Sequence, residues 1–333
     1  MSETLNCSSP SGPEESEIQA NAQVRVDVED IVRILRDKPR HAAGELARYV
    51  LQEHHILNYP IPITSIAHSE KVQIETTTLP FADGALIPSA DGKGYTICIS
   101  DLASAHRWRF AVAHELGHFM LRRMQSTTRL PNTLVLNLSK GVEELFCNWF
   151  AAALLIPDSA ITDFPTWETL TIGRMAERAM ALDVSISAFA RRILERLPHK
   201  DAGYKDTGAM QFRYSPLKED ANASPFLLAD AIFYRLEGMR KHVGMRIPHI
   251  TVLHDVLART YDRTYRYGVT TESLYEAIPL GFTSLSGQYT ILVKPLGGTI
   301  WVLVLPQHVD LNLIKQMCKE AAKPEYTQIA LFP

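Results

Sequence analysis

The sequence predicts an α+β fold in two domains, and the first domain carries the strongest pattern. Strands are expected at residues 72–79 and Tyr95–Ser100, directly before a largely apolar helix that begins near Ser104. A second apolar helix is expected over residues 142–156, where Pro157 ends it. A small sheet followed by two buried helices is therefore the predicted core of this domain.

The C-terminal part of the chain predicts a second α+β domain. Residues 226–243 and 250–266 have helical spacing of apolar side chains. Residues 289–294 and 299–305 alternate as strands on either side of Pro-Leu-Gly-Gly, which indicates a hairpin, and residues 328–332 could add an edge strand.

The first apolar helix contains the pentapeptide His114-Glu115-Leu116-Gly117-His118. Side chains four residues apart share one face of a helix, so both imidazoles can reach a single metal ion. Glu115 lies beside the pair, where it can act as a general base toward a water molecule. Two histidines and a glutamate buried without partners would cost several kcal/mol, and a metal removes that cost. The alternative is a chance pentapeptide on an amphipathic helix.

A catalytic zinc site usually has three protein ligands, so a third ligand is expected elsewhere. The extended metzincin motif would place a glycine and a histidine where this chain has Leu121 and Met124, which excludes that class. In the second apolar helix, Glu144 lies one turn before Asn148, so the two share a face. We expect Glu144 to complete the site and Asn148 to hydrogen-bond a ligand histidine. Glu143 points about 100° away and is expected to be a solvated charge.

Together these segments resemble the ImmA/IrrE metallopeptidases. The resemblance covers roughly residues 41–200 and depends on two motifs, Arg109-Phe110-x-x-Ala113-His114-Glu115-Leu116-Gly117-His118 and Glu144-x-x-Cys147-Asn148-x-Phe150-Ala151-x-x-Leu154-Leu155-x-Pro157. The family carries alanine where this chain has Cys147, an exchange of one small residue for another.

The resemblance implies a zincin-like metallopeptidase domain that binds Zn²⁺ through His114, His118 and Glu144 and uses Glu115 as its general base. It also implies the substrate, a helix-turn-helix repressor whose cleavage switches on a stress, mobile-element or anti-phage defence operon. The two-domain layout is most similar to the IrrE and CapP branches, and CapP-like members act with a CapH-type repressor beside CBASS operons. By the same kind of resemblance, the C-terminal domain is expected to be a GAF-like sensor.

Cys98 lies in the strand before the histidine helix and has two interpretations. A thiolate is a strong zinc ligand and could fill the fourth coordination position, which would make an inhibitory cysteine switch. Free cysteine is also among the most buried residue types and often only packs. Because side chains alternate along a strand, the sequence does not give the direction of Cys98. Cys147 is a competing thiol, for which packing is favoured.

After Pro157 the sequence resembles a helix-turn-helix over residues 171–197, with helices at Ile172–Ala181 and 186–197. This pair could contact DNA through Arg191, Arg192 and Arg196, or it could pack against the protease core. The family resemblance favours packing.

The composition of the chain indicates its domain boundaries and the class of protein to which it belongs. Residues 1–24 predict a disordered tail, residues 25–200 the metallopeptidase domain, 201–223 a linker and 224–333 the sensor domain. The chain has 333 residues, 46% of them hydrophobic, a net charge of −3 and only 4 cysteines. With no signal peptide and no apolar run long enough to span a bilayer, these features predict a cytoplasmic protein without a membrane partner.

In the sensor domain, arginine and tyrosine alternate from Arg259 to Tyr267. Arginine binds phosphate and tyrosine stacks on unpaired bases, so the pattern is compatible with binding of single strands. The resemblance to the family makes single-stranded nucleic acid the leading expected effector. The predicted contacts are Arg259, Tyr261, Arg263, Tyr265, Arg266, Arg240 and Lys241. An amphipathic helix end and a small-molecule effector are the alternatives.

Two points stay open at this stage. The residue that stabilises the oxyanion is not selected by spacing, and His106, Tyr95 and several arginines are candidates. A different class of function is a non-proteolytic regulator that binds a repressor or DNA stoichiometrically and holds zinc only for structure. The presence of Glu115 argues against a non-proteolytic regulator, because this residue would have no role in a purely structural zinc site with three ligands.

Overall fold

The structure is a computed structural model that describes residues 27–89, 94–127, 138–162, 164, 169–196, 208–215, 226–234, 245–246, 251–282, 285–296, 298–306 and 309–321. The tail predicted at 1–24 and the strand predicted at 328–332 lie outside these residues, as do Arg240 and Lys241. Within the described part of the chain, no helix combines the length and the apolar character that a membrane span requires.

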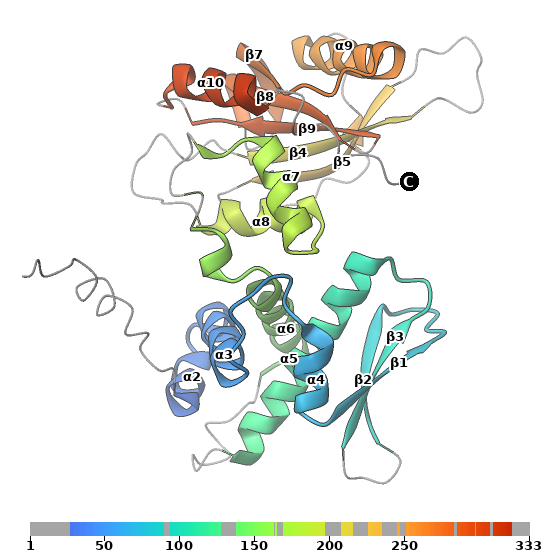
Figure 1. Ribbon diagram of the computed structural model, residues 1–333, viewed down its shortest axis with the longest axis vertical. Helices are drawn as coiled ribbons and strands as arrows, with labels where there is room; N and C mark the ends of the chain where they lie inside the picture. Colours follow the sequence, from blue (N-terminus) through green and yellow to red (C-terminus); the bar gives the residue numbers. More distant parts are fainter. Residues whose placement is uncertain are drawn as a thin grey trace, which may run out of the picture.

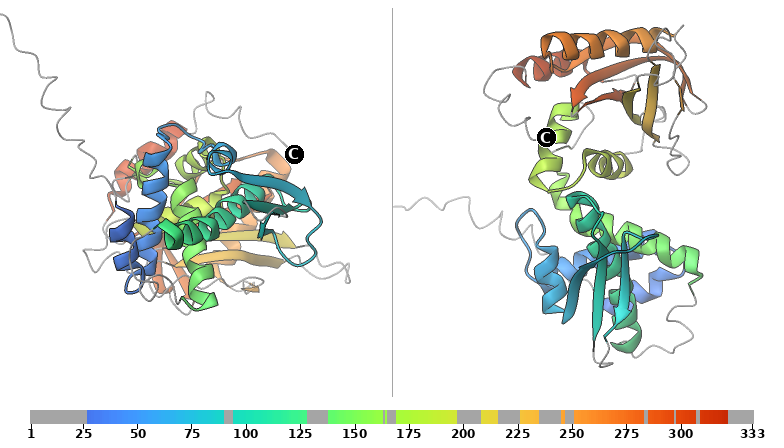
Figure 2. Two further views of the ribbon diagram at one scale, coloured as in Figure 1. Left: turned by 90° about the horizontal axis from the view of Figure 1, so that it is seen from below. Right: turned by 90° about the vertical axis from the view of Figure 1, so that its right-hand side faces the viewer.

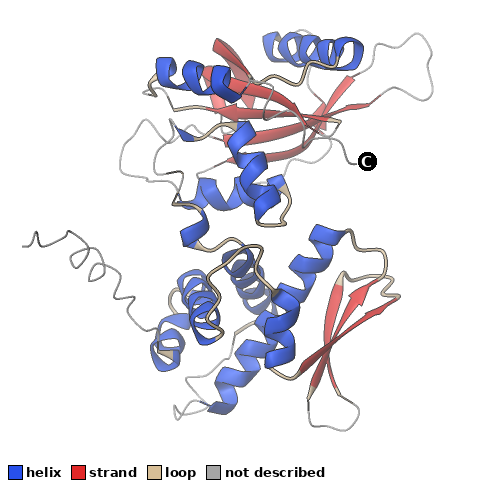
Figure 3. Cartoon of the chain, in the orientation of Figure 1, coloured by secondary structure: helices blue, strands red, loops and turns tan. Residues whose placement is uncertain are grey.

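The first part of the chain is a helical layer beside a small sheet (Figures 1 and 3). Its first three helices are α2 (Val28–Leu35), α3 (Pro39–Glu53) and α4 (Ile63–Ser69). The sheet that follows has the order β1-β3-β2, where β1 is Val72–Thr77, β2 is Gly84–Pro88 and β3 is Tyr95–Ser100. The central strand β3 is parallel to β1 and antiparallel to β2. Strands β1 and β3 are confirmed, whereas no strand was predicted where β2 lies.

Helices α5 (Ala105–Thr127) and α6 (Lys140–Leu155) pack directly on one another, which confirms the two predicted apolar helices. Gly117 in α5 is the point of closest approach. A Cβ atom there would lie 3.0 Å from Cδ1 of Phe150 and 3.3 Å from the Cα and Cβ atoms of Cys147. A side chain at 117 would therefore push α6 away, and the small side chain of Cys147 contributes to the fit.

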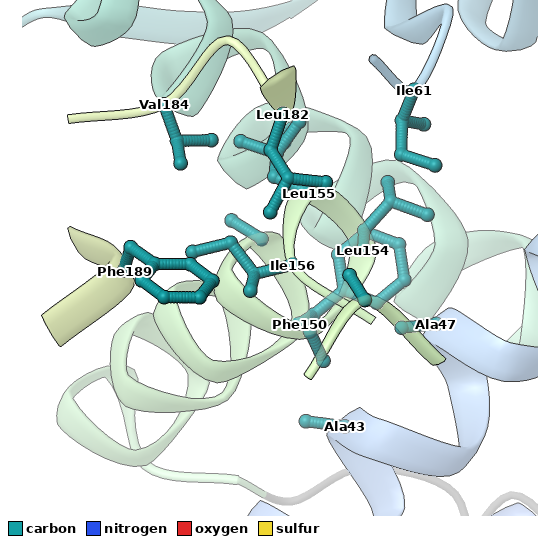
Figure 4. Packing of buried hydrophobic residues seen from close by; sticks show 14 of the residues in the cluster. Ala43, Ala47, Ile61, Phe150, Leu154, Leu155, Ile156, Leu182, Val184 and Phe189 are labelled. Carbon is teal, nitrogen blue, oxygen red and sulfur yellow. The ribbon is translucent and has the colours of Figure 1, made fainter. Parts of the chain in front are cut away.

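Helices α7 (Ile172–Ala181) and α8 (Ile186–Arg196) form the predicted helical pair. They lie between helices α5 and α6 on one side and the C-terminal sheet on the other, and they contact both parts (Figures 1 and 2). Figure 4 shows the contact, where Leu155 and Ile156 from α6 and its C-cap meet Val184 of the α7–α8 turn and Phe189 of α8. The pair is therefore built into the hydrophobic core, as the packing interpretation predicted.

The C-terminal part is a six-stranded antiparallel sheet with helices on both faces. The strands follow the order β6-β5-β4-β9-β8-β7, which brings the first strand of this part beside the last. They are β4 (Gly208–Ser215), β5 (Phe226–Tyr234), β6 (Met245–Arg246), β7 (Ser273–Phe282), β8 (Leu285–Leu296) and β9 (Thr299–Val304), with the helices α9 (Val252–Tyr267) and α10 (Leu311–Ala321).

Helix α9 and the β8–β9 hairpin confirm the prediction for those segments, but two other predictions here were wrong. Residues 226–243 were expected to form a helix, and Phe226–Tyr234 is strand β5. The predicted linker 201–223 contains β4, which pairs with β5 and β9 in the middle of the sheet. A short apolar run fits a buried strand as well as a helix, and which of the two forms depends on the segments that pack or pair with it. The α+β class agrees with the structure, and the GAF likeness stays a prediction.

The two faces of this sheet belong to different cores. Ile300, Val302 and Val304 of β9 pack with α9 in a core of their own. Trp301 and Leu303, which alternate with them, join the larger core that contains α7 and α8. The C-terminal sheet and the helical pair thus share one hydrophobic interior.

A buried carboxylate joins the same two parts. Glu272, just before β7, accepts hydrogen bonds from the backbone N–H groups of Ile172 and Gly173 at 2.7 and 3.0 Å. These groups open α7, where unpaired N–H donors and the helix dipole favour an anion. Burial raises the pKa of Glu272, and the two backbone donors and Lys294 oppose that shift. The C-terminal part therefore supplies the acceptor for the first turn of α7.

We expect the change Glu272→Ala to lower the free energy of unfolding by about 1–3 kcal/mol, because two buried N–H donors lose their acceptor. Urea denaturation of the full chain measures this. Glu276→Ala is the matched control, since Glu276 is half exposed and pairs with Lys315 at 2.7 Å, a contact worth about 0–1 kcal/mol. Equal losses in the two variants would contradict a special role for Glu272.

Candidate metal centre

Two histidines and one glutamate come together where α5 and α6 cross. The His114 and His118 rings, one turn apart on α5, have centroids 5.0 Å apart. Their Nε2 atoms lie 3.3 and 3.7 Å from the two carboxylate oxygens of Glu144 on α6. One ligand atom from each of the three residues falls within 4.8 Å of the others, which is a spacing that one metal ion can bridge.

The opposite nitrogen of each ring is held by α6. His114 donates from Nδ1 to Oδ1 of Asn148 at 3.1 Å, and His118 donates from Nδ1 to Glu143 at 2.7 Å. A neutral histidine that donates from Nδ1 has its lone pair on Nε2, so both lone pairs are presented on the Glu144 side. Two imidazoles and a carboxylate are a donor set that suits Zn²⁺.

Glu143 therefore has a role that the sequence analysis missed. It was expected to be a solvated charge, and its side chain is 36% exposed, but it orients His118. The signal was available in principle, because a metal-ligating histidine almost always needs a partner for its other nitrogen. Asn148 met that requirement for His114 only.

Burial, and next the neighbouring His118, lowers the pKa of His114. A lowered pKa keeps the ring neutral near pH 7, which is the form that binds a metal. Its environment in the protein thus favours the neutral form of His114 that can bind a metal ion.

Glu115 lies between the two histidines in the chain and is buried, with 7% of its surface exposed. Burial raises its pKa, and a hydrogen bond from the backbone N–H of Leu86 in β2 opposes that shift. A Cβ atom on Gly84, also in β2, would lie 3.2 Å from Cγ of Glu115. The glycine lets β2 approach closely enough to hold this carboxylate in place.

The centre opens into a cavity of about 1470 Å³ that His114, Glu115, His118 and Glu144 line. This is more than the roughly 300–1,000 Å³ of small-molecule pockets and suits a length of polypeptide. Gly84 and Ala85 of β2 border it. The strand directly before α5, β3, is paired on both sides, so β2 forms the sheet edge at this cavity.

The oxyanion candidates separate in the structure. His106 lines the cavity, with Nε2 3.6 Å from Asp183. Tyr95 does not line it and packs instead against Phe119, with Arg122 over its ring at 5.3 Å. Of these two residues the geometry retains His106, and among the arginine candidates Arg107 also lines the cavity.

Cys98 faces away from the centre. In β3 it alternates with Ile97 and Ile99, which are fully buried in the core. Its partners across the sheet are Glu75 and Ala85, and burial followed by the charge of Glu75 raises the pKa of its thiol. Because Cys98 is outside the group of described ligand atoms, the structure gives no support to the interpretation of Cys98 as an inhibitory zinc ligand. Burial likewise raises the pKa of Cys147, which agrees with packing.

The arginines of the helical pair and those of α9 are far apart in the fold. Arg191, Arg192 and Arg196 line the cavity. Arg192 is buried and donates to the carbonyl oxygen of Ile156 at 3.1 Å, so it is not part of a solvated DNA-binding face. The residues Arg259, Tyr261, Arg263, Tyr265 and Arg266 lie on α9, which covers the other face of the C-terminal sheet and does not line the cavity.

A second group with metal-like spacing, Glu53, His54 and Glu70, is an ion-pair network. Arg123 of α5 pairs with both carboxylates, and His54 lies 2.9 Å from Glu70. A cation already occupies the position between these acids. The network ties α3 and the end of α4 to α5.

We expect Glu144→Ala to abolish stoichiometric zinc binding, because it removes one of three ligands. Glu143→Ala should keep the ligands and weaken zinc binding by about 10–100-fold, since His118 loses its orienting partner. Competition with a chromogenic chelator measures both, and Glu177→Ala, at an exposed position of α7, is the control. Full occupancy in Glu144→Ala would contradict the ligand assignment.

Comparison with known proteins gives a family for this region. Residues 69–194 match the model of the IrrE N-terminal-like domain, Peptidase_M78. No curated protein matches the chain. A solved structure titled Mycobacterium tuberculosis transcriptional regulator aligns over 84% of this chain and 80% of its own, at 13% identity and a TM-score of 0.45. The matched region includes both histidines, Glu115 and Glu144, and its family implies peptidase activity. Residues 69–194 of this chain are thus similar to the IrrE N-terminal-like domain of the M78 peptidases.

Proposed function

We propose that this protein is a zinc-dependent endopeptidase that cleaves a helix-turn-helix transcriptional repressor and thereby derepresses a stress or anti-phage defence operon. The observation that carries the proposal is the convergence of His114, His118 and Glu144 in a large cavity that also contains Glu115. The repressor as substrate comes from the resemblance to the ImmA/IrrE metallopeptidases.

The arrangement of these residues supports a separate chemical role for the metal ion and for Glu115. When bound, Zn²⁺ would polarise the scissile carbonyl and activate the attacking water. Glu115 takes the proton of that water and passes it to the leaving amine. The raised pKa of Glu115 suits the first transfer, because a carboxylate with a higher pKa is a stronger base. The N–H of Leu86 keeps the carboxylate in position between the two transfers.

The edge strand β2 supports the binding of an extended substrate. It pairs with β3 on one side only, and Gly84 and Ala85 border the cavity. A peptide that adds to this edge as a further strand would gain backbone hydrogen bonds from β2. Its scissile bond would then lie beside Glu115, which β2 itself contacts.

We expect Glu115→Gln to retain zinc and to lose about 10²–10⁴-fold in turnover, because the amide cannot accept the proton. The assay incubates the zinc-loaded chain with the helix-turn-helix repressor encoded nearest to its gene and follows cleavage by electrophoresis. Equal regulatory activity of Glu115→Gln and the unaltered protein would favour the alternative function, a non-proteolytic regulator that binds the repressor or DNA stoichiometrically.

We further propose that single-stranded nucleic acid on α9 activates cleavage. The rings of Tyr261 and Tyr265 stack with centroids 5.9 Å apart and planes at 7°, and Tyr265 is 79% exposed. Arg259 and Arg263 are exposed one turn apart on the same helix. An exposed ring beside arginines is the combination that binds unstacked bases and phosphates. A partly buried Tyr261, which packs on the α9 core, would hold the outer ring in place.

We expect Tyr265→Ala to weaken binding of a fluorescent oligothymidine by about 5–100-fold, the range for loss of one stacked base. Tyr267→Ala is the matched control, because Tyr267 is 73% exposed on a different side of α9. Fluorescence anisotropy of the full chain measures both variants. Cleavage of the repressor that is independent of the oligonucleotide would remove this effector and leave the peptidase assignment standing.

A further inference from the structure

The cavity that contains the metal centre has a cationic end that the catalytic chemistry does not use. Its basic side chains come from the start of α3 and from α8, two elements far apart in the chain. They are Lys38, Arg40, Arg191, Arg192 and Arg196. We call this set the cationic end.

The positive charge of the cationic end is only partly neutralised. Glu195 pairs with Arg40 at 2.6 Å and with Arg191 at 3.3 Å. Asp158 pairs with both Arg192 and Arg196. Four of the five cations thus share two carboxylates, and the fifth is Lys38, so these seven described residues have three positive charges in excess. The other acid at this rim, Glu45, has its own partner in Arg48 at 3.0 Å.

Two arginines of the cationic end are accessible, and the buried one, Arg192, is charged at neutral pH. Burial lowers the pKa of Arg192 to about 10, so even this guanidinium stays protonated. The side chains of Arg40 and Arg191 are each 54% exposed, whereas Glu195, which they share, is 12% exposed. A ligand in the cavity therefore meets the guanidinium groups before it meets the carboxylate.

An apolar floor joins the cationic end to the metal centre. It follows α6, where Leu145 and Trp149 line the cavity, and continues to Ile156, whose carbonyl oxygen accepts from Arg192. From Glu144 to Ile156 the rise along the helix is about 18 Å, at about 1.5 Å per residue. An extended peptide covers that distance in roughly five or six residues.

We propose that the cationic end binds an acidic segment of the polypeptide substrate, about five or six residues from the bond that is cut. The inference rests on the proposed function, since it places the segment in the same cavity as the scissile bond. Aspartate and glutamate side chains match the excess charge, and the apolar floor accommodates the residues between. A polypeptide is favoured over nucleic acid because the cationic end lines the same cavity as the metal centre, where the proposed function places a peptide bond.

The test measures binding without turnover. Full-length Glu115→Gln protein, loaded with zinc, is titrated into a fluorescent capped peptide of twelve residues that contains four consecutive glutamates. A second peptide has glutamine at those four positions. We expect the acidic peptide to bind about tenfold more tightly in 50 mM NaCl and to lose that advantage in 500 mM NaCl, because salt screens exposed charges.

Variants then locate the binding. Arg40→Gln combined with Arg191→Gln should reduce affinity for the acidic peptide by about tenfold, with little effect on the glutamine peptide. Arg33→Gln is the matched control, since Arg33 is 63% exposed on α2 and neither it nor its partners Glu29 and Asp30 line the cavity. If the double variant unfolds, Arg191→Gln alone should still lower affinity about threefold.

Two results would overturn the inference. One is equal binding of the two peptides. The other is displacement of the acidic peptide by oligothymidine with the same dependence on Arg40 and Arg191, which would make the cationic end a nucleic-acid site. The proposed function fails separately: a protein that cuts no repressor but binds the acidic peptide through these arginines would keep the site and lose the peptidase assignment.

Discussion

The close contact of α5 with α6 at Gly117 is the constraint on which the rest of the site depends. Since residue 117 has no side chain, α6 packs directly against the histidine helix, and Cys147 and Phe150 fill the contact. That contact brings one turn of α6 to both histidines. Glu144 faces their Nε2 atoms, while Glu143 and Asn148 hold their Nδ1 atoms. A single packing distance therefore sets the ligand geometry, the tautomers and the orientation of both rings.

The sequence predicted the parts of the site that follow from helical spacing within one segment. His114 and His118 share a face by periodicity, and so do Glu144 and Asn148. It did not predict the features that depend on contacts between segments. Glu143 orients a histidine from another helix. Strand β2 forms the sheet edge at the cavity because β3 is the central strand. The face of the sheet to which Cys98 points depends on how β3 pairs with its neighbours. Strand β5 was missed for a related reason, since its sheet partners are distant in the chain.

The metal centre is also connected to the C-terminal part of the molecule. Arg109, one turn and a residue before His114, pairs with Asp183 in the α7–α8 turn at 3.1 Å and donates to the carbonyl oxygen of Ile61. At the other end of α7, Glu272 accepts from the first N–H groups of the helix. The helical pair therefore touches the catalytic helix at one end and the C-terminal sheet at the other, and the shared core fills the space between.

This shared interior changes how the chain is divided. The segment that matches the peptidase family ends at residue 194, inside α8, yet its helices rest on Trp301 and Leu303 from the far end of the chain. A gene fragment that stopped at the family boundary would encode α7 and α8 with that apolar face bare and the start of α7 without its acceptor. The matched segment is therefore not an independent folding unit, because the C-terminal part of the chain completes its hydrophobic interior.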